Sequence, residues 1–243
     1  MNNSLSRKIK KRKGKIIYLL AIEIILLILD GYYLFVGNDY VNVVRVTVTF
    51  ILAMIPMTME LIFNMSIPWP VYCFTVIYAC EHTMGSCFNL YLFIPWWDDM
   101  MHCTEGFLFA MFGYYYLSFG NEKTIKHRLK YLLFAVSLSV FIAVLWEMTE
   151  YGVDNVSKSD MQKDTFVTKI NSYLLADNTG EIVTIDNISE VTVDGKVLPG
   201  YIDIGLTDTM IDLMTALAGA VVFSIYCLID RDRHPLLKFE ESS

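Results

Sequence analysis

Acidic residues and a histidine recur at helical spacing in three apolar stretches of this sequence. Residues spaced i, i+3, i+4 and i+7 share one face of a helix, so each set forms a polar stripe. The three stripes are Asp98, His102 and Glu105; Glu147, Glu150 and Asp154; and Asp208 and Asp212. Carboxylate oxygens with an occasional histidine nitrogen suit Mg, Mn, Ca or Zn. The stripes therefore predict an inward-facing site that binds a divalent metal.

The first functional hypothesis is a metal-dependent enzyme that acts on a lipid or lipid-linked substrate at the outer leaflet of a membrane. The expected metal ligands are Asp98, Glu147, Asp208 and Asp212. The expected catalytic residues are His102, as a ligand or general base, and Glu105 and Glu150, which would orient ligands or move protons. Four neighbours could extend the site, namely Asp99, Asp154, Glu81 and His82.

A location at the membrane surface explains some of these acids, but not the second stripe. Carboxylates stabilise the N-terminus of a helix, which accounts for Asp98 and Asp208. The helix with Glu147 and Glu150 is expected to run outward, so these acids lie at the negative end of its dipole. So many carboxylates at one level repel each other unless they are protonated or bridged by a cation. Arg45 is the only basic residue expected in the helices at this level.

Two other functions are compatible with the stripes. An ion- or proton-coupled transporter also needs intramembrane carboxylates, although these acids gather at one end of the helices rather than at the midplane. A non-catalytic envelope scaffold or sensor would dock another protein through its outer loop and would use the acids as a structural cation site. The enzyme and the scaffold are equal alternatives on the sequence alone.

The composition is that of a membrane protein. Of 243 residues, 55% are hydrophobic and 19% are charged, with a mean hydropathy of +0.44. The runs long enough to cross a bilayer are 16–36, 41–63, 67–87, 98–119, 130–151 and 208–229. We therefore predict an all-α membrane protein with about six transmembrane helices in a lipid bilayer. The net charge of −7 and the short basic clusters exclude nucleic acid as a partner.

The basic residues predict the orientation of these helices. Seven precede residue 16, four lie between residues 123 and 130, and three follow residue 230, which makes 14 of the 19. If six helices alternate, these segments share one side, and the positive-inside rule makes that side cytoplasmic. The predicted organisation is a basic cytoplasmic N-terminus (1–15), a five-helix transmembrane region (16–152), an extracytoplasmic cap loop (153–207), a sixth helix (208–229) and a cytoplasmic tail (230–243).

The cap loop is expected to be a small mixed α/β segment. Asp160 could cap a short amphipathic helix that carries Phe166, Ile170 and Leu174. The segments 181–185 and 190–193 alternate in the manner of short strands. Asp194-Gly195 is a hairpin-turn signal before a third short strand, 196–198. These elements predict a cap too small to fold alone.

Four motifs resemble, in their order along the chain, those of the YjdF-like family of bacterial inner-membrane proteins of unknown function. They are His82-x-x-Gly85, Trp97-Asp98-x-x-x-His102-x-x-x-Gly106, Trp146-Glu147-x-x-Glu150 and Asp208-Thr-x-x-Asp212-x-x-x-Ala-x-x-Gly219-Ala220. The resemblance runs from about Glu60 to Ala220 and implies a bacterial cytoplasmic membrane and these acids as motif positions. The chain is more loosely similar to VanZ-like membrane proteins, but Ala216 stands where their second motif has Asn. The partners that follow are lipid, a lipid-linked substrate or another envelope protein.

Overall fold

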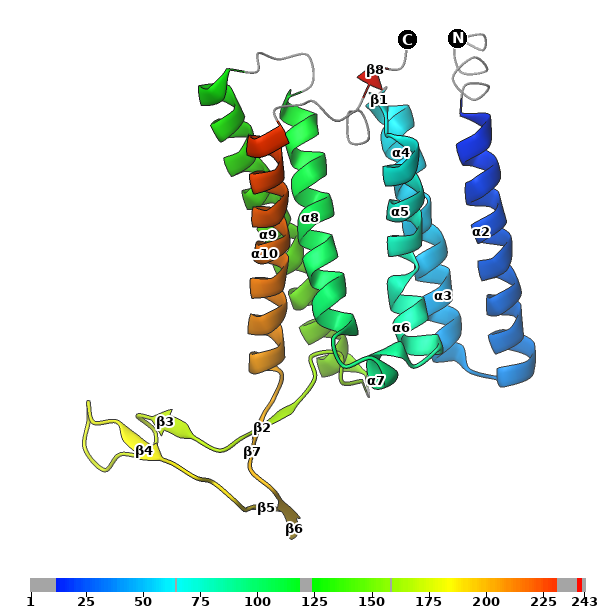
Figure 1. Ribbon diagram of the computed structural model, residues 1–243. Helices are drawn as coiled ribbons and strands as arrows, with labels where there is room; N and C mark the ends of the chain where they lie inside the picture. Colours follow the sequence, from blue (N-terminus) through cyan, green and yellow to red (C-terminus); the bar gives the residue numbers. More distant parts are fainter. Residues whose placement is uncertain (1–11, 64, 119–123, 158, 231–239, 242–243) are drawn as a thin grey trace.

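The structure is a computed structural model that describes residues 12–63, 65–118, 124–157, 159–230 and 240–241. It is a bundle of long helices with short strands that extend from one end (Figure 1). The helices are α2 (Lys13–Tyr32) with the π-helical turn η1 (Tyr33–Gly37), α3 (Tyr40–Ala53), α4 (Ile55–Ile62), α5 (Trp69–Ala79), α6 (Glu81–Cys87), α7 (Leu90–Phe93), α8 (Trp97–Ser118), α9 (Ile125–Val156) and α10 (Leu206–Asp230). The strands are β1 (Met65–Ser66), β2 (Thr165–Val167), β3 (Ile170–Ser172), β4 (Val183–Ile185), β5 (Val191–Val193), β6 (Lys196–Leu198), β7 (Tyr201–Asp203) and β8 (Glu240–Glu241).

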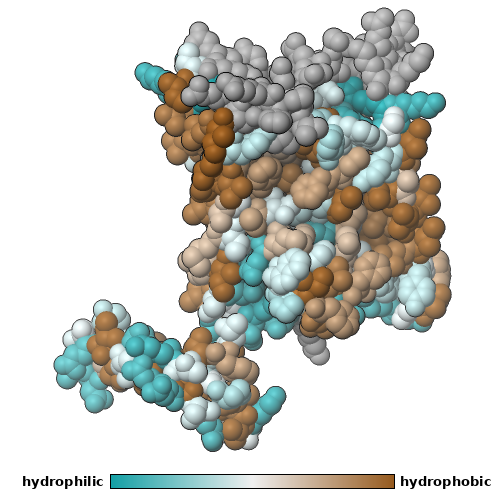
Figure 2. Space-filling model, viewed as in Figure 1, coloured by the Kyte–Doolittle hydropathy of each residue, from teal (hydrophilic) through white to brown (hydrophobic). Residues whose placement is uncertain are grey.

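Four helical segments among the described residues are long and apolar enough to cross a membrane. They are Lys13–Gly37, Tyr40–Ile62, Ile125–Val156 and Leu206–Ile229, and they coincide with the first, second, fifth and sixth predicted spans. Many of their apolar side chains are exposed, and Figure 2 shows hydrophobic residues over the flanks of the bundle. Such surface is stable in contact with lipid rather than with water. The membrane character predicted from the sequence is confirmed.

The third and fourth predicted spans have a different character. The third is divided at Cys80 into α5, of 11 residues, and α6, of 7 residues. The fourth is the 22-residue helix α8, in which polar residues lower the hydropathy. Half of the residues of α8 are buried, because α9 and α10 pack against it. The four long apolar helices are therefore accompanied, within the same bundle, by one divided helical segment, α5 with α6, and by one more polar helix, α8.

Two glycines bring α8 and α10 into backbone contact. A Cβ added to Gly106 would lie 1.8 Å from the carbonyl oxygen of Ala216. A Cβ added to Gly219 would lie 1.9 Å from the carbonyl oxygen of Cys103. Helices in membranes use small residues in this way, because close approach maximises van der Waals contact. The Ser139 hydroxyl of α9 also donates to the Gly106 carbonyl at 3.0 Å, so α8, α9 and α10 pack together at this glycine.

A buried ion cluster joins the helices at the end of the bundle away from strands β2 to β7 (Figure 1). Glu60 is fully buried at the end of α4 and accepts from Arg12 Nε at 2.7 Å and from the Ile67 amide at 2.8 Å. Lys15 forms a second ion pair with the same carboxylate. Removing one partner of such a buried cluster leaves an uncompensated charge, which is strongly destabilising. These contacts join α2, α4 and the start of α5.

The loop between α9 and α10 contains strands and no described helix, so the predicted helix after Asp160 is wrong. Phe166 lies in β2 and pairs with Ile202 of β7, and Ile170 lies in β3 and pairs with Ile185 of β4. Antiparallel pairing overrides the weak helical periodicity of this short segment, because the same apolar residues also satisfy strand pairing. The predicted strands and the Asp194-Gly195 turn are confirmed, with positive φ at both turn residues and β5 paired to β6.

The strands extend away from the bundle (Figure 1). They form two-stranded ribbons, β2–β7, β3–β4 and β5–β6, that leave large apolar side chains exposed, such as Leu174 at 95% and Ile204 at 82%. The structure does not describe three segments that were expected in the cytoplasm. They are residues 1–11 of the basic N-terminus, the loop at 119–123 and the tail at 231–239.

The glycine contact yields a first prediction. Gly106→Ala should destabilise the protein by about 1–3 kcal/mol or more, because its methyl group must push two backbones apart. The measurement is the loss of folded monomer with temperature, followed by fluorescence-detected gel filtration in detergent. Gly152→Ala in α9 is the matched control, because no atom lies within 4 Å of its added Cβ. Equal melting of wild type and Gly106→Ala would contradict the prediction.

Candidate functional site

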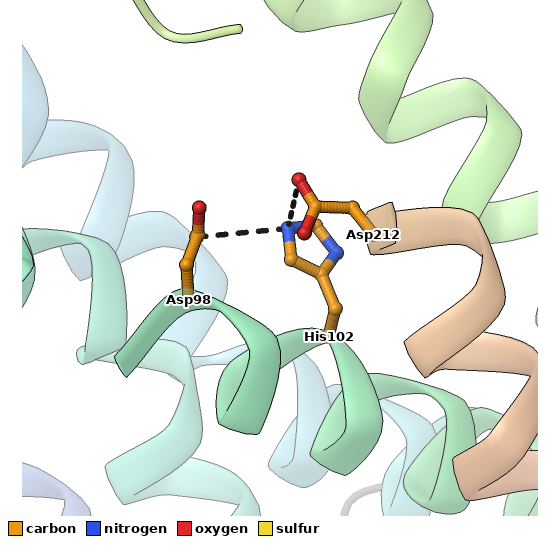
Figure 3. A group of neighbouring side chains, drawn as sticks. All are labelled: Asp98, His102 and Asp212. Carbon is orange, nitrogen blue, oxygen red and sulfur yellow. Dashed lines mark ion pairs between the residues drawn. The ribbon is translucent and has the colours of Figure 1, made fainter. Parts of the chain in front are cut away.

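The stripes of α8 and α10 meet at His102. Its Nε2 atom lies 3.7 Å from Oδ1 of Asp98 and 3.5 Å from Oδ2 of Asp212, so the imidazole lies between the two carboxylates (Figure 3). One ligand atom from each of the three residues lies within 4.8 Å of the others. His102 is 5% exposed and Asp212 is 2% exposed. This buried group could hold a metal ion, as the sequence predicted for the two aspartates.

The second nitrogen of His102 faces another carboxylate. His102 Nδ1 lies 3.3 Å from Oε2 of Glu105, one turn along the same helix. A histidine that binds a metal through one nitrogen commonly gives the N–H of the other to a carboxylate, which fixes the tautomer and the ring orientation. Here Glu105 faces Nδ1 of His102, and the two aspartates face its Nε2 atom. His102 therefore fits the part of a ligand better than that of a free base.

The three acids of the α9 stripe lie near the group or beside it, each in a different environment. Glu147 is buried, its Oε1 atom has no hydrogen-bond partner among the described residues, and its Oε2 atom lies 3.5 Å from Gln162 Nε2. Glu150 is 7% exposed and faces the cavity between the helices. Asp154 faces the following loop instead. The sequence grouped the three by spacing, and the structure gives each of them different surroundings.

Asp154 anchors the segment that follows α9. Its carboxylate accepts from the Met161 amide at 2.8 Å and 2.9 Å, from the Gln162 amide at 2.9 Å and from the Ser159 hydroxyl at 2.7 Å. Gln162 then reaches α10 and donates to the Thr209 hydroxyl at 2.6 Å. Gly205, with φ of +79°, has no side chain to oppose this approach, since an added Cβ would lie 2.6 Å from Gln162 Cβ. Residues 159–163 are therefore held over the carboxylates.

Lys163 contacts two acids of the candidate site, and the sequence analysis missed it. Its ammonium group pairs with Asp98 and lies 4.0 Å from Asp208 Oδ1, and its backbone amide donates to Asp208 Oδ2 at 2.9 Å. Burial lowers the pKa of Lys163, but the hydrogen bond to Asp98 and the charges of the aspartates outweigh it and raise the pKa above its usual value. Arg45, expected to compensate the acids, donates to Asn42 at 2.9 Å within its own helix. Lys163 is one of four lysines in this acidic loop, with Lys158, Lys169 and Lys196, so the sequence offered no signal that singles it out.

A cavity of about 520 Å³ adjoins the group, between the helices α3 to α6 and the pair α8 and α9. Most of its wall is apolar and is formed by residues such as Leu52, Met59, Phe112 and Ile142. Its polar end contains Asp98, His102, Glu105, Glu150, Glu81 and His82. The volume is within the range of about 300–1,000 Å³ typical of small-molecule sites. The cavity is therefore amphipathic, with the candidate metal group at its polar end.

The additional residues expected at the site take different positions. Glu81 accepts from the Tyr91 hydroxyl at 3.3 Å and lines the cavity. His82 also lines the cavity, and its ring contacts the rings of Tyr91 and Trp146. The carboxylate of Asp99 makes no hydrogen bond or ion pair to any residue that the structure describes. The structure thus brings together acids from α6, α8, α9 and α10 and leaves Asp99 outside.

Comparison with protein-family models matches residues 16–233 to one family, described as predicted membrane protein (DUF2238). No curated protein matches the sequence. No solved structure matches it either. The family description supports a membrane protein and names no reaction.

The anchored loop yields a second prediction. Asp154→Ala should speed hydrogen exchange at the Met161 and Gln162 amides by about tenfold or more, because hydrogen bonds to a charged acceptor contribute about 1.5–3 kcal/mol each. Hydrogen–deuterium exchange with mass spectrometry measures the peptide that contains them. Asp160→Ala is the control, because Asp160 accepts only a 3.4 Å contact from the Asp164 amide. Unchanged exchange in Asp154→Ala would show that other contacts hold the segment.

Proposed function

We propose that this chain, which belongs to the predicted membrane protein family DUF2238, is a metal-dependent enzyme that acts on an amphiphilic, lipid or lipid-linked substrate. The observation that carries the proposal is that Asp98 and His102 of the buried group line a largely apolar cavity. A site for a small polar metabolite would not need such walls. A lipid-like substrate can place its apolar chain in the cavity and its polar linkage beside the group.

The residues have separate parts in this proposal. Asp98, Asp212 and His102 Nε2 are the proposed ligands, and three protein ligands leave a position for water or substrate. A divalent metal there would polarise the substrate and lower the pKa of bound water. Glu105 orients His102. Asp208 and Glu147, which the sequence analysis expected as ligands, flank the group within the same polar region.

Glu150 faces the substrate side and is proposed to receive or supply a proton. Glu147 lies on the other side, where its unpaired Oε1 atom can accept a hydrogen bond from water at the site. Lys163 neutralises Asp98 and Asp208 before the metal binds. A metal therefore competes with the ammonium group of Lys163 for Asp98.

We also infer six membrane crossings, with the site at the outer surface. The start of α2 and the end of α10 lie at the same end of the bundle, as an even number of crossings requires (Figure 1). β1 and β8 pair at that end as well. The basic residues of the first turns of α2 and α9 are on this side, which the positive-inside rule makes cytoplasmic. The resemblance to YjdF-like proteins supports a bacterial cytoplasmic membrane.

The orientation predicts which positions an impermeant reagent can reach. In a cysteine-free variant, Glu190→Cys, directly before β5, should react with an impermeant maleimide in intact cells. Lys126→Cys at the start of α9 should react only after the membrane is permeabilised, and both positions are exposed in the structure. Gel-shift labelling measures both. The reverse pattern would place the site on the cytoplasmic side, and labelling of both in intact cells would contradict six crossings.

The metal site predicts a stoichiometric divalent ion. Purified wild type should contain about one ion per chain, and Asp98→Asn/Asp212→Asn should contain none, because both carboxylate ligands are gone. Elemental analysis measures the ion, and EDTA should lower the thermal stability of wild type but not of the double variant. Asp99→Asn is the matched control, since Asp99 is adjacent in sequence but outside the group.

Lys163→Gln sharpens the same experiment. Removal of the competing ammonium group should lower the metal concentration needed for half-saturation, while Asp98 and Asp212 remain. If the double variant retained its metal, residues other than Asp98 and Asp212 would have to be the ligands. Absence of metal and of any EDTA effect in all variants would contradict the proposal and favour the scaffold or transporter hypotheses.

A further inference from the structure

The charge at the polar end of the cavity is one-sided. Four carboxylates line it, those of Glu81, Asp98, Glu105 and Glu150, and no Lys or Arg is among the described lining residues. A divalent ion held by Asp98 and Asp212 would balance those two residues only. Lys163 offers one further positive charge beside Asp98. Glu81, Glu105 and Glu150 therefore leave a surplus of carboxylates where a substrate head group would lie.

Glu150 is the most important carboxylate of this surplus for ligand binding. It is 7% exposed and lines the cavity, yet its carboxylate makes no hydrogen bond or ion pair to any described residue. A buried carboxylate without a partner is costly, and a ligand with N–H donors and a positive charge would satisfy it. The orphaned side chain faces the volume that a ligand would fill. Glu150 is not a member of the Asp98–His102–Asp212 group.

The aromatic residues nearby are also suited to a cation. Tyr91 and Trp146 line the cavity beside His82, and ring faces attract ammonium groups. The chain supplies a direct example, because Lys163 Nζ lies 5.2 Å from the centre of the Tyr91 ring and pairs with Asp98. An alkyl ammonium group thus already occupies the rim of this polar end. A second ammonium group on a ligand would meet the same kinds of partner at Glu150 and Trp146.

We propose that the cavity binds an amphiphile with one apolar chain and a positively charged amine head group. In this proposal, the alkyl chain of the ligand lies between the apolar residues of α3 to α5 and those of α8 and α9. The amine head group of the ligand lies between Glu150 and Glu81. This proposal names the substrate class of the proposed enzyme and rests on that function for its catalytic meaning. The binding itself follows from the charge and shape of the cavity.

Binding of a labelled long-chain amine tests this inference. The probe is tritiated dodecylamine, and the protein is the full chain in phosphatidylcholine nanodiscs, with retention by empty nanodiscs subtracted. Wild type should bind the amine saturably. Glu150→Gln, which keeps the shape but removes the charge, should weaken binding by about tenfold or more. Asp99→Asn is the control and should bind as wild type does, because it removes a charge outside the cavity.

Matched ligands separate the head group from the chain. Dodecanoate and dodecyl phosphate should not compete with the amine, and ethylamine, which lacks the chain, should compete only weakly. Equal competition by dodecyl phosphate would overturn the amine head group in favour of a phosphate bound through the metal. Absence of saturable binding, or unchanged binding in Glu150→Gln, would also overturn the inference.

The metal content of each sample distinguishes this inference from the proposed function. Glu150→Gln should keep its metal, because Glu150 is outside the Asp98–His102–Asp212 group. Metal in wild type without amine binding would overturn the substrate class and leave the metal enzyme intact. Saturable amine binding without metal would overturn the metal enzyme and leave the ligand of the cavity intact. Filling the apolar part with Ile142→Trp should abolish amine binding while metal is retained.

Discussion

The close contact between α8 and α10 is the constraint on which the candidate site depends. Gly106 meets the backbone of Ala216, and both helices begin at the end of the bundle from which the strands extend (Figure 1). His102 precedes Gly106 by one turn, and Asp212 precedes Ala216 by one turn. In two helices that run in the same direction, residues one turn before a contact face each other. The glycine contact therefore places the imidazole against the carboxylate.

The carboxylates of the bundle are compensated in different ways. Glu60 has two basic partners, Asp154 has backbone amides, and Asp98 shares Lys163 with Asp208. One oxygen of Asp212 and one of Glu147 lack hydrogen-bond partners among the described residues, and Glu150 has no described polar contact. Uncompensated acids are expensive in a low-dielectric bundle. Both oxygens of Glu23 and one of Asp30, in α2, are unpartnered as well. Asp212 differs from these because it lies beside His102 in a group that could hold a metal ion.

Spacing within a helix was predictable from the sequence, and contacts between helices were not. The stripe of Asp98, His102 and Glu105 needed only the period of a helix, and the Asp194-Gly195 turn needed only local backbone preferences. Which stripes meet depends on where the glycines of α8 and α10 touch. The sequence also could not show that Asp154 binds the following loop, because a carboxylate at a helix end fits either use. The helix predicted after Asp160 failed because strand pairing over a distance overrides local periodicity.

Lys163 joins the strands to the chemistry of the bundle. The segment that precedes β2 is held to α9 by Asp154 and to α10 by Asp208, and the same lysine pairs with Asp98. β7 leads directly into α10, where Asp203 accepts from the Leu206 and Thr207 amides at 3.1 Å and 2.8 Å. Both ends of the extended strands are thus fixed by carboxylates, those of Asp154 and Asp208 at one end and that of Asp203 at the other. Asp98 and Asp208 therefore contact the segment that anchors β2 through the same lysine that lies beside the candidate metal group.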